Sequence, residues 1–283
     1  MKQMKSKISL QQLIQGIIRA VFFFFFPAVF SIAFTGVKYM IEQMAAGKSF
    51  ELNSFLIAFL VVIGFTVVFG RFFCGFACAF GTYGDVLYEG ANWFRKNRKK
   101  KSLGFSVKTG NYLKYGKYVV LVVLLFMCFV GKSGVIGTHS PWTVFSRLHA
   151  WKFSVDMIGL LIFVVLSIAM IVEKRFFCRF ICPLGAIFTM LPVMPFSAIK
   201  RDRQNCIKGC RACQIKCPAN INIADSREGD NDEMGECFSC GKCVAICPKS
   251  HIYMNVRGKK EAFEYAMVIK AVILIGICLL LGL

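Results

Sequence analysis

Long apolar stretches alternate with short basic ones along most of this chain. Five stretches approach the roughly 18–20 apolar residues that a helix needs to cross the hydrocarbon core of a bilayer. The first follows a basic start, as a signal peptide does, but no small-residue cleavage site follows it, so we expect it to be retained. The pattern predicts an α-helical membrane protein of two helix pairs plus a C-terminal helix. The five stretches are residues 20–41, 53–70, 115–131, 155–172 and 266–283.

Composition and charge placement support this prediction and orient it. The 283 residues are 57% hydrophobic and carry a formal net charge of +20. Lysine and arginine gather before the first stretch, between the second and third, and after the fourth. Because positive loops stay cytoplasmic, we expect a multi-pass protein of the cytoplasmic (inner) membrane, with its N-terminus inside and its C-terminus outside. Nucleic-acid binding is not expected, since the chain has no helix-turn-helix or aromatic platform.

Twelve of the 14 cysteines fall in tight groups on the predicted cytoplasmic side, where disulfides rarely persist. Metal ligation is the better explanation. The second of two C-terminal runs matches the bacterial ferredoxin spacing C-x2-C-x2-C-x3-C-P, whereas the first has one extra residue between its first two cysteines. Zinc also accepts four thiolates, but two runs each closed by C-x3-C-P favour 4Fe-4S clusters. The runs are Cys206, Cys210, Cys213, Cys217 and Cys237, Cys240, Cys243, Cys247.

This segment resembles the two-cluster ferredoxins. In them the fourth cysteine of each run crosses to the other cluster. The resemblance implies two 4Fe-4S clusters in a small α+β ferredoxin-like domain. The extra residue is expected to bulge out of the turn and makes Cys206 the ligand that departs from the pattern. The implied ligand sets are Cys206, Cys210, Cys213 and Cys247 for one cluster, and Cys237, Cys240, Cys243 and Cys217 for the other.

An internal duplication accounts for the remaining grouped cysteines. Residues 71–81 read RFFCGFACAFG and residues 175–185 read RFFCRFICPLG, each just after an apolar stretch. On a helix, two cysteines four residues apart face one way. We hypothesise that the two pairs meet and bind a third iron–sulfur centre; dithiol redox chemistry and a purely structural role of buried thiols stay open. The four cysteines are Cys74, Cys78, Cys178 and Cys182.

The segment after the second copy, residues 176–199, is apolar enough to cross again. Basic pairs flank it on both sides, however, and a crossing would reverse the predicted side of the ferredoxin region. Three prolines, Pro183, Pro192 and Pro195, also interrupt a regular helix. We therefore expect a re-entrant or interfacial segment, which is tolerated where protein buries it.

Together, the duplicated C-x3-C motifs and the two cysteine runs resemble the NapH-type membrane ferredoxins over residues 15–257. Those proteins are quinol-dehydrogenase subunits of periplasmic nitrate reductase systems. The resemblance implies a cytoplasmic ferredoxin domain that exchanges electrons with a quinone, a flavoprotein or other redox subunits of a membrane complex. The stretch at 266–283 lies outside the four-helix pattern of that type.

These observations predict three parts: a membrane domain of four transmembrane helices (1–199), a ferredoxin-like domain (200–260) and a C-terminal transmembrane helix (261–283). We expect an electron-transfer subunit of an oxidoreductase rather than a stand-alone enzyme, and no catalytic residue is assigned. Two alternatives stay open: a maturation factor that supplies electrons for metal-site assembly, and a redox-sensing regulator. His139 and His149 are candidates for contact with a quinone or a haem.

Overall fold

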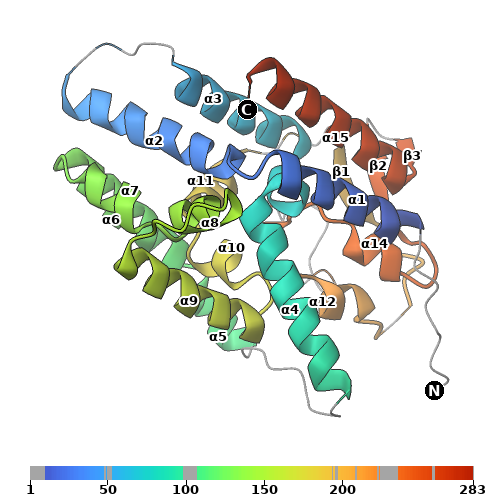
Figure 1. Ribbon diagram of the computed structural model, residues 1–283. Helices are drawn as coiled ribbons and strands as arrows, with labels where there is room; N and C mark the ends of the chain where they lie inside the picture. The colour runs from blue at the N-terminus through green and yellow to red at the C-terminus, as the bar shows by residue number, and fades with distance from the viewer. Residues whose placement is uncertain are drawn as a thin grey trace.

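Figure 1 shows a computed structural model of the chain, which is mostly helical and carries one small sheet. The structure describes residues 10–47, 49, 53–97, 107–192, 194, 197–207, 209–221, 223, 235–256 and 259–282. One continuous buried core joins the long helices to the duplicated motifs and to part of the second cysteine run.

The first apolar stretch forms two helices rather than one. Helix α1 (Leu10–Phe25) and helix α2 (Val29–Ala45) meet at an angle of 61°. Pro27 lies in the break, as expected for a residue that cannot continue the helical hydrogen bonds. Helix α3 (Ser54–Phe69) then packs against α2. Gly36 permits this close approach, since a Cβ there would lie 2.3 Å from the carbonyl oxygen of Phe55.

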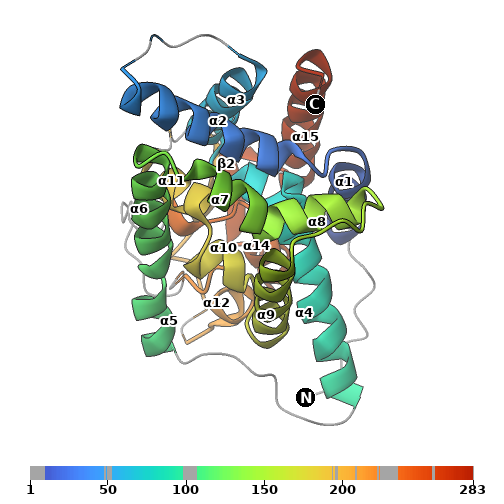
Figure 2. The ribbon, with the colours of Figure 1, turned by 60° about the vertical axis from the view of Figure 1, so that its left-hand side comes forward.

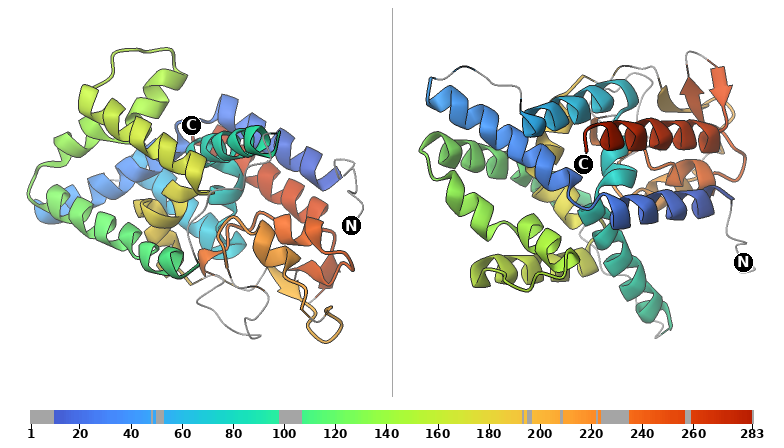
Figure 3. Two further views of the ribbon diagram at one scale, coloured as in Figure 1. Left: turned by 90° about the horizontal axis from the view of Figure 1, so that it is seen from below. Right: turned by 45° about the horizontal axis from the view of Figure 1, so that its top comes forward.

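The second helix pair is α6 (Gly116–Phe129) and α9 (Met157–Val172), preceded by the short α5 (Val107–Leu113). Between them run α7 (Ser133–His139) and α8 (Pro141–His149), which cross in front of the bundle in Figure 2. Helix α4 (Ala79–Asn97), which follows the first motif, packs against α9. Helix α15 (Phe263–Leu280) lies beside α1, as the right panel of Figure 3 shows.

The five predicted stretches correspond to α1–α2, α3, α6, α9 and α15. Within the described part of the chain, only α15 is long and apolar enough to cross a membrane as one helix, and the bent α1–α2 pair is a second candidate. Helices α3, α6 and α9 have 16, 14 and 16 residues, fewer than the sequence pattern predicts. Multiple crossing therefore stays a prediction.

The duplicated motifs fold into short helices inside the protein. The first forms a π-helix, η1 (Phe73–Ala77), and the second forms α10 (Phe176–Phe180) followed by α11 (Pro183–Met190). Helix α11 is largely buried and packs against α6. The described part of 176–199 is thus broken into α10, α11 and β1, and α10 and α11 are largely buried, whereas Met190 and Met194 are exposed; its re-entrant or interfacial placement stays a prediction.

The ferredoxin-like region is built on a three-stranded antiparallel sheet. Its order is β1-β2-β3, formed by Ser197–Arg201, Ile252–Val256 and Lys259–Glu261. Strands β1 and β2 pair from Ser197↔Val256 to Arg201↔Ile252, so they bracket both cysteine runs. The runs contribute helices α12 (Ala212–Lys216) and α14 (Lys242–Ile246), which pack against each other.

Candidate iron–sulfur centres

The two duplicated motifs meet in the interior and bring Cys74, Cys78, Cys178 and Cys182 together. All four are buried. Burial, followed by the charge of neighbouring cysteines, raises the pKa values of Cys78 and Cys182. Burial also raises the pKa of Cys178 to about 11. The positive charge of bound iron ions would offset the free-energy cost of ionising these buried thiols, since a cysteine that binds a metal is deprotonated.

Neither pair lies on one continuous helix, contrary to the helical arrangement considered from the sequence. Cys74 is in η1 and Cys78 ends it, whereas Cys178 is in α10 and Cys182 caps α11. The second cysteine of each pair accepts a backbone hydrogen bond at the start of the next helix. The amide of Gly81 donates to Cys78 Sγ at 3.4 Å, and the amide of Gly185 donates to Cys182 Sγ at 3.2 Å. These bonds favour a thiolate at both positions.

The arginine that opens each motif packs against the other copy. A Cβ on Gly81 would lie 2.9 Å from Nη1 of Arg175, and a Cβ on Gly185 would lie 3.2 Å from Nη2 of Arg71. The glycine that closes each motif therefore makes room for the opposite arginine. This crosswise contact holds the two cysteine pairs face to face.

Arg175 is fixed by a buried carboxylate from α4. Its Nε and Nη2 donate to the two oxygens of Asp85 at 2.8 and 2.7 Å, and its Nη1 donates to the carbonyl of Cys74. Although burial opposes ionisation, Arg175 holds the pKa of Asp85 well below its usual range. Arg175 has a left-handed backbone, with φ of 55°, and this two-pronged ion pair offsets the strain.

Arg71 has no equivalent carboxylate partner within the motifs. The residue of the second copy that corresponds to Asp85 of the first copy is Thr189. Arg71 Nη1 donates to Thr189 Oγ1 at 3.3 Å and to Glu236 Oε2 at 3.4 Å. Glu236 also pairs with the buried Lys117. The missing carboxylate is thus supplied by the ferredoxin-like region, from the residue just before Cys237.

Residues 235–241, which we call the docking segment, place the second cysteine run against the motifs. The ring of Phe238 is fully buried between the guanidinium groups of Arg71 and Arg175, whose Cζ atoms lie 4.9 and 5.4 Å from its centroid. Helix α1 holds the other end, where the side chains of Gln15 and Gln11 donate to the carbonyls of Cys240 and Gly241, both at 2.9 Å. Two cation–π contacts and two buried hydrogen bonds fix the segment.

Gly75 is the closest backbone contact of the docking segment. A Cβ at this position would lie 2.3 Å from the carbonyl oxygen of Phe238, and backbone cannot move aside as a flexible side chain can. We expect Gly75→Ala to accelerate hydrogen exchange across residues 235–256 by about tenfold. Gly64→Ala is the matched control, because a Cβ there meets no atom within 4 Å. Equal exchange in both variants would contradict the docking role.

The two cysteine runs adopt the same local geometry. Cys213 lies in α12 and Cys243 in α14, and each run ends with its fourth cysteine at the end of that helix. Three residues after the fourth cysteine, Asn220 and Ser250 have φ values of 54° and 52°. The residue before the second cysteine is also left-handed in both runs, with φ of 76° at Gly209 and 49° at Ser239. The left-handed residue before the second cysteine is therefore common to both runs and does not depend on the longer spacing after Cys206.

Cysteines of the two runs lie close enough for their charges to act on one another. Burial and then the charges of Cys237, Cys240, Cys217 and Cys213 raise the pKa of Cys243, so a cysteine of the other predicted set also acts on it. Burial raises the pKa of Cys237 to about 12, with contributions from Cys240 and Cys217. Cys247 packs against a small buried cluster formed by Cys213, Cys243 and Ile252. Cys206, the departing member, accepts a hydrogen bond at 2.9 Å from Arg201 Nη2. The ligand assignment itself stays a prediction.

Among the described residues, no three His, Cys, Asp or Glu side chains are grouped as ligands of one metal ion. In a 4Fe-4S cluster each thiolate binds a different iron atom, so its ligands surround a cube rather than converge on one ion. The surroundings fit an anionic group of that kind. Arg71 Nε and Nη2 and Lys270 Nζ are buried without a hydrogen-bond partner. Arg71 lies beside Cys74 and Cys182, and the charge of Cys237 acts on Lys270.

The remaining candidate residues lie elsewhere. His139 Nδ1 is 2.5 Å from Asp156 Oδ2 at the start of α9, and His149 packs edge-on against Phe23. Their proposed quinone or haem contact stays a prediction. Sequence reasoning gave no role to Asp85, Phe238 or Lys117. The signals were present: an arginine repeated at the same place in both motifs, and isolated charges beside apolar stretches.

In comparisons with known proteins, both cysteine-bearing parts match models of 4Fe-4S proteins. A family described as a 4Fe-4S binding domain matches residues 54–101 and 155–193, which contain the duplicated motifs, and a 4Fe-4S dicluster domain matches residues 198–248. An uncharacterised protein of Methanocaldococcus jannaschii is 28% identical over 89% of this chain and 98% of its own length.

Two further relatives have informative names. The ferredoxin-type protein NapH of Haemophilus influenzae is 25% identical over 76% of this chain and 73% of its own length. The methylamine utilization ferredoxin-type protein MauN of Methylobacillus flagellatus is 23% identical over 71% of this chain and 56% of its own length. No solved structure matches the chain.

Proposed function

We propose that the chain, which is similar to NapH-type 4Fe-4S ferredoxins, passes electrons between a quinol or a cytoplasmic donor and a partner redox enzyme. The relatives and family matches support an iron–sulfur electron-transfer role. The proposal that electrons pass between the two cysteine-rich parts is supported by the docking segment, which joins these parts through one buried interface. Its quinol donor and partner enzyme are the parts that need a test.

The proposed path has three centres. The first cysteine run and Cys247 would hold the outermost one, and the second run with Cys217 would hold the middle one. The four motif cysteines would hold a third, against which the docking segment packs. Phe238, which directly follows Cys237 and contacts Arg71 and Arg175 of the motifs, would lie between the last two. Iron–sulfur clusters transfer single electrons at potentials that hydrogen bonds, charge and burial tune.

A belt of five cations supports this arrangement and its placement in the membrane. Each predicted crossing has one largely buried cation at its predicted cytoplasmic end: Arg19, Arg71, Lys117, Arg175 and Lys270. Contacts of these residues converge on the docking segment or on the segments beside it. All five predicted inner ends would then meet the clusters on one face. Buried positive charge there favours reduction of an anionic cluster.

Exposed apolar side chains support multiple crossing. Helices α6, α9 and α15 present them along whole faces, including Phe126, Leu161 and Ile269, which are 67%, 65% and 58% exposed. Apolar surface of this extent marks contact with a membrane or a partner. We propose five crossings with the ferredoxin-like region in the cytoplasm.

The proposal is tested by mixing the cluster-loaded protein in proteoliposomes with a soluble quinol under anaerobic conditions. We expect bleaching of the iron–sulfur absorbance to the extent reached with dithionite. Cys74→Ala/Cys178→Ala should slow the quinol reaction by about tenfold or more, while reduction by dithionite persists. If dithionite reduces the clusters and no quinol does so, the quinol part of the proposal is wrong.

A further inference from the structure

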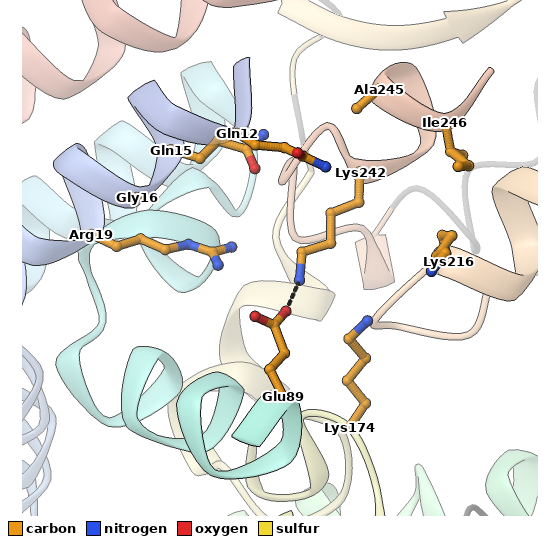
Figure 4. A pocket seen from close by; sticks show the side chains of 10 residues that line it. All are labelled: Gln12, Gln15, Gly16, Arg19, Glu89, Lys174, Lys216, Lys242, Ala245 and Ile246. Carbon is orange, nitrogen blue, oxygen red and sulfur yellow. Dashed lines mark hydrogen bonds and ion pairs between the residues drawn. The ribbon is translucent and has the colours of Figure 1, made fainter. Parts of the chain in front are cut away.

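A cavity of about 590 Å³ lies where α1 and α4 meet the ferredoxin-like region. Its lining residues come from α1, α4, the turn between α9 and α10, α12 and α14, and Figure 4 shows their side chains around it. Two of its walls belong to the cluster-binding runs, because Lys216 precedes Cys217, and Lys242 precedes Cys243. The cavity adjoins the buried interface that holds the docking segment, because Gln15 lines the cavity and also donates to the carbonyl of Cys240.

The cavity has a strong excess of positive charge. Arg19, Lys174, Lys216 and Lys242 line it, against one carboxylate, Glu89. That carboxylate is bound to Lys242 at 3.0 Å. Within the described part of the chain, no carboxylate forms an ion pair with Lys174 or Lys216. The Nη2 atom of Arg19 is buried and has no hydrogen-bond partner.

Several positive charges close together in a partly buried cavity are energetically unfavourable unless an anion neutralises them. Burial and then the charge of Lys242 lower the pKa of Lys174, although the charges of Asp85 and Glu89 oppose this shift. These two carboxylates bind Arg19 and Lys242 and form no ion pair with Lys174 or Lys216 among the described residues. A phosphate offers several acceptor oxygens and matches convergent lysine and arginine donors. The neutral part of the lining, with Gln12, Gln15 and Ile246, leaves room for the rest of a larger ligand.

The rim of the cavity also borders apolar surface. On α1, Gln12 and Gly16 line the cavity, whereas the adjoining Leu13 and Ile17 are 53% and 56% exposed. Polar and apolar surfaces therefore meet along one helix edge. Basic pockets at the cytoplasmic edge of membrane helices suit the headgroups of anionic lipids.

We propose that this cavity binds a phosphate group, carried either by an anionic phospholipid or by a soluble phosphorylated compound. The site adds a ligand to the proposed electron-transfer function and does not depend on the identity of the electron donor. Its occupant would lie against the segments that carry Cys217, Cys243 and Cys247. The ligand would thereby change the charge around the middle centre.

The test uses the full-length, cluster-loaded protein in neutral detergent. Dioleoylphosphatidylglycerol is titrated against dioleoylphosphatidylcholine and its occupancy followed by native mass spectrometry, while inorganic phosphate and flavin mononucleotide are titrated by calorimetry. We expect saturable binding of a phosphate-bearing probe, weakened about tenfold or more in Lys174→Gln/Lys216→Gln. Lys132→Gln/Lys152→Gln, which removes the same charge from exposed positions, should bind as the wild type does.

A second variant provides an independent test if Lys174→Gln/Lys216→Gln does not fold. Gly16→Glu places a carboxylate in open space at the cavity and should also abolish binding, whereas Gly137→Glu, at an equally open position on α7, should not. Phosphatidylglycerol binding alone identifies a lipid, and competition by inorganic phosphate or the flavin nucleotide identifies a soluble ligand. Absence of saturable binding, or equal binding by the variants and wild type, overturns the proposal. Failure of quinol reduction with intact phosphate binding would reject only the proposed function.

Discussion

Removing Cys74 and Cys178 together is expected to lower the iron content from about twelve to about eight atoms per chain, because three 4Fe-4S centres hold about twelve. The expected loss is selective, since the two ferredoxin-type runs do not include these cysteines. Anaerobic iron and sulfide quantification measures the content, and EPR spin quantification after dithionite reduction measures the number of paramagnetic centres. The same fractional loss should appear in both.

The control must separate loss of a centre from loss of packing. Cys128→Ala/Cys278→Ala removes two other buried thiols, which are 4% and 2% exposed and lie in α6 and α15. This variant should retain about twelve iron atoms. If the wild type already contains about eight, or if Cys74→Ala/Cys178→Ala loses none, the motif cysteines do not bind a centre. Dithiol chemistry or a structural role would then explain them.

Replacing Arg175 by methionine is expected to destabilise the protein by about 3 kcal/mol, because a buried carboxylate loses its main partner. Asp85 would retain Arg19, whose Nη1 lies 3.1 Å from Asp85 Oδ2, so the carboxylate is not left entirely alone. The contact with the Cys74 carbonyl would also disappear. Unfolding by denaturant, followed through protein fluorescence in a fixed detergent, measures the change in free energy.

A double-mutant cycle isolates the ion pair. Asp85→Asn and Arg175→Met should each be destabilising, and the combined variant should cost less than their sum by about 1–3 kcal/mol. Glu89→Gln provides the comparison for an exposed pair: Glu89 is 60% exposed, and loss of its contact with Lys242 should change stability by no more than about 1 kcal/mol. Additive effects of Asp85→Asn and Arg175→Met would show that the pair does not act as a unit.

The sequence predicted the chemistry of this protein better than its geometry. Cysteine spacing and the duplicated RFFC motif located both cysteine-rich parts, because metal ligation requires short spacings between cysteines that are visible in the sequence. The continuous first helix was a wrong expectation, since Pro27 divides it into α1 and α2. Hydropathy alone counts apolar residues and does not report where the helix bends.

The interface between the helical part and the ferredoxin-like region could not be predicted from residue spacing. Glu236 belongs to an acidic run whose preceding members, at positions 225–233, lie outside the described residues, and nothing in the sequence separates it from them. Its contact with Arg71 spans 165 positions along the chain. Likewise, Gln11 and Gln15 face the protein interior while Leu13 and Ile17 are exposed, an order opposite to that of a helix on a water-soluble protein.

The two copies differ at one position, where the first has Asp85 and the second has Thr189, and this difference affects how the ferredoxin-like region packs against the helical part. A perfect duplicate would satisfy both arginines internally, and the helical part would then be complete without the ferredoxin-like region. Here, Arg71 keeps one hydroxyl from within that part and takes its carbonyl and carboxylate contacts from Gly235 and Glu236. Correct docking of the second cysteine run is therefore coupled to the packing of the helical part, because the buried Arg71 and Lys117 obtain a carboxylate partner, Glu236, only from that run.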